Sequence, residues 1–191
     1  MTTKFFTNQG DNTLYKKFEG IFKYTKVNDF DALVGYLRAS GYFKIRKFLK
    51  KVPKIRILVG INVDKAIKHY HQIGLEFATN EQKILEELNK DLKSDIQNSP
   101  YNKETEEGIL EFIKDISSKK IEIAAHPSKN IHAKIYIFKP KPFNKHNSGS
   151  VITGSSNLSA TGIGALPESN YEFNVELRDY DDVNYASKEF E

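Results

Sequence analysis

A histidine and a lysine stand two residues apart in the apolar run IHAKIYIF, residues 131–138. Alternation along a β-strand would put His132 and Lys134 on the same side, about 6–7 Å apart along the chain. A polar pair of this kind is not expected on the packing face of a fully buried strand. The alternative is an amphipathic edge strand whose histidine and lysine face solvent.

The segment VITGSSNLS, residues 151–159, predicts a strand that runs into a Gly-Ser-Ser-Asn turn and then a short helix. Small residues with free backbone N–H groups, followed by the N-terminus of a helix, form an anion-binding corner. A later strand over residues 170–177 alternates again and carries Glu172 on its polar side. The turn therefore predicts an anion site between two strands that bear ionisable groups.

Taken together and in this order, the three segments H-x-K, G-S-x-N and N-x-E resemble the motifs of the phospholipase D superfamily. The resemblance is strongest to its nuclease branch of small bacterial endonucleases and metal-independent restriction enzymes, and it is specific over residues 131–177. It implies an α/β fold in which a mixed β-sheet is flanked by helices on both faces. The matching residues are His132 and Lys134, then Gly154, Ser155 and Asn157, then residues 170–172 with Glu172 as the acid.

The resemblance implies a phosphodiesterase that acts on DNA through a phosphohistidine intermediate. His132 would attack phosphorus as a neutral imidazole, and Glu172 would accept a hydrogen bond from its far ring nitrogen. Lys134, Asn157 and Ser155 would stabilise charge on the non-bridging oxygens, with Gly154 beside them in the phosphate-binding turn. No metal or other cofactor is required by this scheme.

Two features depart from the superfamily pattern. An Asp usually follows the Lys by a few residues, whereas residues 135–140 contain no acid. The gap between Lys134 and Gly154 is also longer than usual, and the extra length is a basic loop, residues 139–147.

Three lysines of this loop, and a stretch with seven basic residues and no acid at 44–56, are expected to contact the nucleic-acid backbone. The loop lysines are Lys139, Lys141 and Lys145.

Only one H-x-K occurs in the chain, while the two-step displacement of the superfamily uses two such motifs. We therefore expect a homodimer with both copies of the motif at a shared active site. Domains of this look also stand at the N-terminus of bacterial helicase-like proteins, so a C-terminal helicase domain is a further expected partner.

The alternative is a non-catalytic DNA-binding or dimerisation module, which the missing Asp and the long loop keep open. A phospholipase is disfavoured because no amphipathic membrane helix is evident.

Strands and helices alternate along the rest of the chain, which indicates an α/β domain with a mixed sheet. A capping box at Thr79 predicts a helix that ends before Pro100, and residues 64–73 and 179–191 give no clear signal, the latter suiting a short last helix. The other expected helices span residues 42–51 and 103–118, and the strands span 30–38, 55–60, 121–124, 131–138, 150–153 and 171–177.

Composition limits the classes to which the protein can belong. A chain of 191 residues without cysteine fits one domain, residues 1–191, and excludes a disulfide scaffold, a thiolate zinc site and a cysteine nucleophile. With 39% hydrophobic residues and a net charge of only +4, it is too apolar and too balanced to be disordered. No long apolar run or signal sequence is present, so we expect a cytoplasmic protein without a membrane partner. His69 and His71 lack a neighbouring acid to complete a metal site.

Overall fold

The computed structural model describes residues 3–63, 65–77, 103–125, 131–166 and 171–191. Its centre is a seven-stranded mixed sheet in the order β1-β7-β6-β5-β2-β3-β4. The strands β2, β3 and β4 are parallel, whereas β5, β6, β7 and β1 join antiparallel to their neighbours. The strands are β1 (Phe5–Thr7), β2 (Val27–Leu37), β3 (Lys54–Val63), β4 (Ile121–Ala125), β5 (Ile135–Pro140), β6 (Ser150–Gly154) and β7 (Phe173–Leu177).

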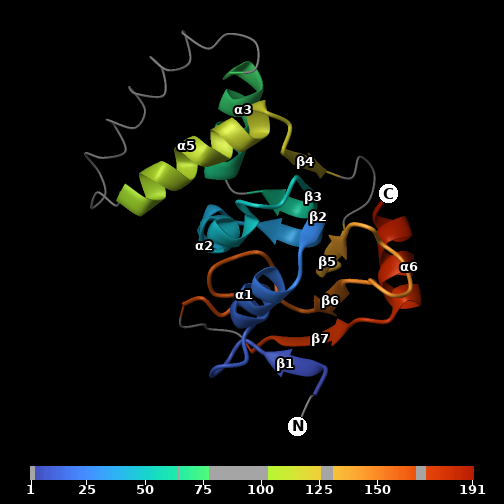
Figure 1. Ribbon diagram of the computed structural model, residues 1–191. Coiled ribbons are helices and arrows are strands. Elements are labelled where there is room, and N and C mark those ends of the chain that lie inside the picture. The colour runs from blue at the N-terminus through green and yellow to red at the C-terminus, as the bar shows by residue number, and fades with distance from the viewer. Residues whose placement is uncertain (1–2, 64, 78–102, 126–130, 167–170) are drawn as a thin grey trace.

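Helices cover both faces of this sheet, as the sequence predicts (Figure 1). One face carries α1 (Leu14–Tyr24), α2 (Ala39–Leu49) and α5 (Lys103–Ser117), with α3 (Lys65–Phe77) packed against α5. The other face carries α6 (Tyr180–Phe190). None of the described helices combines the length and the apolarity needed to cross a bilayer.

The larger core lies under α1 and α2 and is rich in aromatic rings. Phe18 of α1 packs edge-on against Tyr136 and Phe138 of β5 at centroid distances of 5.2 and 5.4 Å. Thr13 caps α1 by accepting a hydrogen bond from the Lys16 backbone N–H at 3.2 Å, which fixes where this helix begins. A smaller core of Ile137, Val151 and Val183 lies under α6. Each face of the sheet is therefore closed by apolar packing of its own.

Most of the predicted elements are present, with shifted ends. The predicted strands at 30–38 and 55–60 are β2 and β3, and the helices at 42–51 and 103–118 are α2 and α5. The two segments without a clear signal contain α3, from Lys65, and α6, from Tyr180, while β1 and α1 are not among the predicted elements. The helix expected between Thr79 and Pro100 lies outside the described residues.

Two predictions near the motifs are wrong. No helix follows the Gly-Ser-Ser-Asn turn, because residues 158–166 form successive turns that contact the start of α2. The strand expected at 131–138 begins only at Ile135, so His132 and Lys134 precede it. Nor is β5 an edge strand, since it lies between β2 and β6. Because residues 158–166 form turns and not a helix, no helix dipole acts at the expected anion site after Gly154.

Candidate active site

His132 and Lys134 meet at the start of β5. The Lys134 ammonium is buried, with 6% of the residue exposed, and donates to the His132 carbonyl oxygen at 2.7 Å. It also lies 3.0 Å from Nδ1 of the His132 ring, which is itself exposed. Burial lowers the pKa of Lys134, and the negative charge of Glu172 opposes that shift. No carboxylate in the described part of the chain forms an ion pair with this ammonium, which makes it a cation that lacks an anion.

Asn157 joins this pair over Gly35 of β2. The Asn157 Oδ1 atom accepts a hydrogen bond from the Tyr36 backbone N–H at 3.0 Å, which leaves its NH₂ group as a donor. A Cβ atom on Gly35 would lie 3.3 Å from Asn157 Oδ1 and 3.6 Å from Lys134 Nζ. The absence of a side chain at this bulged position of β2 therefore keeps open the space between the two donors.

Gly154 and Ser155 do not offer the phosphate contacts that the sequence predicts. The Gly154 N–H donates to the Lys134 carbonyl oxygen at 3.3 Å, and the Ser155 N–H donates to the Phe173 carbonyl oxygen at 3.1 Å. The Ser155 hydroxyl donates to Glu172 and accepts from the Phe173 N–H. Both residues are thus occupied in joining β5, β6 and β7. A Cβ at Gly154 would lie only 2.3 Å from the Phe173 oxygen, so this close approach requires glycine.

Glu172 lies at the same end of the sheet but does not reach the histidine. Its hydrogen bond goes to Ser155, and the described residues show none between Glu172 and His132. Its backbone N–H donates to Oδ1 of the buried Asn8 at 3.0 Å, which ties it to the segment after β1. Burial raises the pKa of Tyr136, and the charge of Glu172 raises it further. The carboxylate is therefore close enough to act on both Tyr136 and Lys134 electrostatically.

A buried set of hydrogen bonds supports the site from behind. The Tyr136 hydroxyl donates to the Ser156 carbonyl oxygen at 2.8 Å, and Asn174 Nδ2 donates to Ser156 Oγ at 2.9 Å. All three residues are at most 2% exposed. Satisfied buried networks fix geometry because each unpaired group would cost free energy. They hold the turn that carries Asn157 against β5 and β7.

The basic loop lies away from these residues. Since β5 and β6 form an antiparallel hairpin, His132 and Gly154 stand at one end and residues 141–149 at the other. Pro140 stands six positions after Lys134, which corresponds to about 20 Å along the strand. Lys141 and Lys145 are exposed there. They do not line the space around His132 and Asn157.

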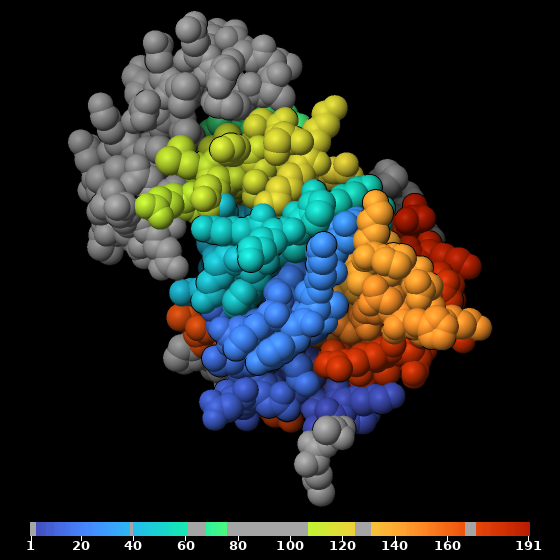
Figure 2. Space-filling view, in the orientation of Figure 1, coloured from blue at the N-terminus to red at the C-terminus, as the bar shows by residue number. Residues whose placement is uncertain are grey.

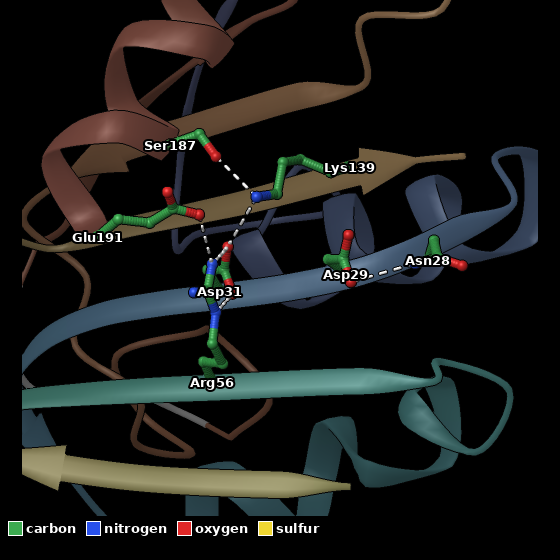
Figure 3. Close-up of polar contacts among 7 residues, drawn as sticks. All are labelled: Asn28, Asp29, Asp31, Arg56, Lys139, Ser187 and Glu191. Atoms are coloured by element: carbon green, nitrogen blue, oxygen red, sulfur yellow. Dashed lines mark hydrogen bonds and ion pairs between the residues drawn. The ribbon is translucent and has the colours of Figure 1, made fainter. Parts of the chain in front are cut away.

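The structure does not support the expected contact of Lys139 with nucleic acid, because its side chain faces the interior beneath α6 (Figure 3). Its ammonium lies 3.4 Å from Oδ2 of Asp31 and donates to Ser187 Oγ at 2.7 Å. Asp31 is fully buried on β2 and accepts two hydrogen bonds from Arg56 of β3, at 2.7 and 2.8 Å. The Asp31 carboxylate raises the pKa of Arg56. Lys139 is thus consumed by this buried ion network and is not available to a phosphate.

Although residues 135–140 contain no acid, a carboxylate lies beside this stretch, because Asp31 on the neighbouring strand β2 approaches Lys139 at 3.4 Å. Asp31 is not among the residues that the sequence motifs indicate, and neither are Gly35, Asn8 and Asn174. Gly35 carried a signal, since a lone glycine in a strand pattern indicates a bulge or a close backbone approach. Asp31 gave none, because its partners come from two other strands.

The described residues contain no group of three or more potential metal ligands among His, Asp and Glu. His69 and His71 both belong to α3, where residues two apart do not face each other.

Comparison with known proteins agrees with this architecture. Residues 44–191 match the family model described as "Cardiolipin synthase, PLD-like domain". Polyphosphate kinase from Porphyromonas gingivalis superposes on 98% of the chain with a TM-score of 0.52 and 11% identity, over 25% of its own length. A yeast tyrosyl-DNA phosphodiesterase mutant (H432N) covers 90% of the chain with a TM-score of 0.44 and 12% identity, over 31% of its own length. No curated protein sequence matches.

These solved structures are similar in fold only, and the chain spans between a quarter and a third of their length. The family match extends over more than half of the chain and includes His132, Lys134, Asn157 and Glu172, whereas Asn8, Asp31, Gly35 and Tyr36 precede it. The chain therefore belongs to the phospholipase D-like (PLD-like) family.

Proposed function

We propose that this domain hydrolyses phosphodiester bonds in DNA without a metal, through a phosphohistidine on His132. The observation that carries the proposal is Lys134, a buried residue whose ammonium stands beside an exposed imidazole and has no carboxylate partner among the described residues. Burying an unpaired cation is costly, and a phosphate oxygen would compensate it. The NH₂ group of Asn157, which donates to none of the described residues, borders the same space and would donate to a second oxygen.

The reaction takes two balanced steps. His132 Nε2 attacks phosphorus, the bond to the leaving oxygen breaks, and that oxygen takes a proton from an acid. Water then gives a proton to the conjugate base of that acid and attacks the phosphohistidine, the P–N bond breaks with its electron pair returning to His132 Nε2, and a phosphate monoester leaves. Attack through Nε2 requires that the ring proton sits on Nδ1, which now faces Lys134 Nζ. The ammonium must therefore move to the phosphate, after which Nδ1–H is free to donate to Glu172.

A homodimer would supply the acid. With one H-x-K per chain, His132 of a second copy is the residue that this chemistry offers for protonating the leaving oxygen. In a longer protein, a helicase-like domain would deliver the DNA. Sedimentation of the active species tests the first point, because a strictly monomeric protein that still cleaves DNA would exclude the shared site.

A non-catalytic DNA-binding module is the second candidate. It is favoured by one observation, namely that Glu172 bonds to Ser155 and not to His132. The two candidates differ in whether His132 performs chemistry.

Cleavage of plasmid DNA in EDTA by wild type and by His132→Ala decides between them. The enzyme predicts cleavage by wild type alone and a radiolabelled or mass-shifted covalent adduct on His132 with a 5′- or 3′-labelled oligonucleotide. His132→Gln serves as a second variant of similar size. Binding without cleavage by any of the three proteins would support the module and refute the enzyme.

A further inference from the structure

A second basic region lies far from the site, in a groove between the C-terminal ends of α1 and α2. Its volume is about 580 Å³, which is in the usual range for ligand pockets. The apolar part of its lining is Phe22, Val27, Phe48 and Val52. The Phe22 and Phe48 rings are nearly parallel, at 13° and 6.2 Å between centroids, and both are partly exposed. The groove therefore offers aromatic surface to a ligand.

The rim of this groove is strongly basic. Among the described residues, five lysines and one carboxylate, Glu19, line it, and Glu19 bonds to Lys16 at 3.1 Å. Helix C-termini attract lysines, but the partial charge of about −0.5 at each of two helix ends is far smaller than five positive charges. An excess of cations around apolar aromatic surface fits a ligand with anionic and flat apolar parts. The lysines are Lys23, Lys26, Lys47, Lys50 and Lys51.

The groove and the candidate active site lie at opposite ends of the same layer. Val27 at the groove pairs with Pro140, the far end of β5 from Lys134, so about 20 Å of strand separates the two regions. The helix α2 connects them, since Arg38 at its start donates to the Leu158 carbonyl oxygen next to Asn157 and its end forms the groove. Exposed Lys44 and Lys47 lie three residues apart on α2, hence on one side of it. Figure 2 shows α1 and α2 side by side on the viewed surface.

We propose that this groove is an accessory site for single-stranded nucleic acid, which rests on the proposed function because it assigns the substrate class of the same domain. The lysines contact phosphates, and an unpaired base packs on Phe22 and Phe48. A duplex keeps its bases stacked inside and has none to offer to the groove. In a strand whose bases stay stacked the phosphates are about 3.4 Å apart, so 20 Å corresponds to about six nucleotides of stacked strand, and only longer stacked strands occupy both regions.

Fluorescence anisotropy with labelled single-stranded oligonucleotides tests this in the His132→Ala background, so that binding is read without cleavage. The groove variant Lys26→Glu/Lys51→Glu is expected to weaken binding of a 12-mer by about tenfold or more and to reduce the salt slope by about 1.4, at 0.7 per lost phosphate contact. A matched variant, Lys114→Glu/Lys188→Glu, makes the same charge change at exposed lysines elsewhere and is expected to alter affinity less than threefold. Phe48→Leu is expected to weaken binding about fivefold or more through lost stacking.

Four results would overturn the accessory site: equal losses in the two double variants, no loss in either, a 4-mer that binds as tightly as the 12-mer, or tighter binding of a duplex or of anionic phospholipid vesicles. Circular dichroism of each variant shows whether it is folded. The outcome is separable from the proposed function. If no protein cleaves DNA but the groove variant alone loses binding, the nuclease fails and the accessory site stands. If wild type cleaves and the groove variant binds normally, only the accessory site fails.

Discussion

Lys134 and Lys139 stand five residues apart on one segment, and their charges have opposite surroundings. Lys139 lies under α6 with its charge compensated by Asp31 and a hydrogen bond to Ser187. Lys134 is buried next to His132, and its acceptors among the described residues are uncharged, a ring nitrogen and a carbonyl oxygen. A compensated charge costs the fold little once formed, whereas an uncompensated one is costly until an anion arrives. The difference separates a lysine that stabilises the fold from one that is prepared for chemistry.

The largest expected effect on stability comes from Asp31, the carboxylate that compensates Lys139 and Arg56. Asp31→Asn leaves Arg56 and Lys139 without their carboxylate, and breaking a buried ion network in this way costs about 3–5 kcal/mol in the free energy of unfolding. Chemical denaturation measures it. Asp29→Asn is the matched control, because Asp29 lies two residues earlier on the same strand, is only half-buried, and bonds to Asn28 at 3.1 Å. Equal destabilisation by the two variants would contradict the role given to the network.

Lys134→Met should lower activity without lowering stability. Removing one charged donor from the reacting phosphate lowers the cleavage rate by about 10²–10³-fold. The free energy of unfolding should stay the same or increase, since an unpaired buried cation is replaced by an apolar chain of similar length.

Lys139→Met is the control for Lys134→Met. It should cost stability by about 1–3 kcal/mol, because Asp31 loses a charged hydrogen-bonding neighbour, and leave the rate of cleavage per folded molecule unchanged. The comparison fails if Lys134→Met destabilises the protein as much as Lys139→Met does.

This contrast shows what the sequence could and could not reveal. His132, Lys134, Asn157 and Glu172 were found because they occur in short motifs, and the structure brings all four to one end of the sheet. The role of Lys139 was missed, since its partner Asp31 lies more than a hundred residues earlier and sequence spacing carries no information about such pairs. The fate of Gly154 and Ser155 was missed for a similar reason, because whether a backbone N–H is free depends on the register of β5, β6 and β7.

The helices and strands likewise divide into those with a local sequence pattern and those that depend on long-range pairing. Helices and strands with a clear apolar period, such as α5 and β3, were predicted close to their bounds. The strand β1 has three residues and exists only through pairing with β7, so no local pattern marks it. Local physics predicted the elements, and long-range pairing determined which polar groups remained free.

An anion should remove the difference between the two lysines. Inorganic phosphate that binds at Lys134 stabilises the folded state, by about 2.7 kcal/mol at one hundred times its dissociation constant. Thermal unfolding with increasing phosphate should therefore show a rise in Tm for wild type that Lys134→Met lacks. Because burial lowers the pKa of Lys134, the ammonium is lost at a lower pH than in an exposed lysine, and the phosphate effect should fade as the pH rises. An equal rise in Lys134→Met would place the anion elsewhere.

The smallest expected effect comes from the exposed rim of the compensated network. Glu191 approaches Arg56 at 3.7 Å, and its side chain is 63% exposed. Exposed pairs of this kind contribute about 0–1 kcal/mol, and salt screens them. Glu191→Gln should therefore change the free energy of unfolding by less than about 0.5 kcal/mol in 0.15 M salt, against the several expected for Asp31→Asn. Urea denaturation of both variants in parallel measures the ratio. A large loss in Glu191→Gln would mean that the side-chain carboxylate of Glu191, and not Asp31 alone, compensates Arg56.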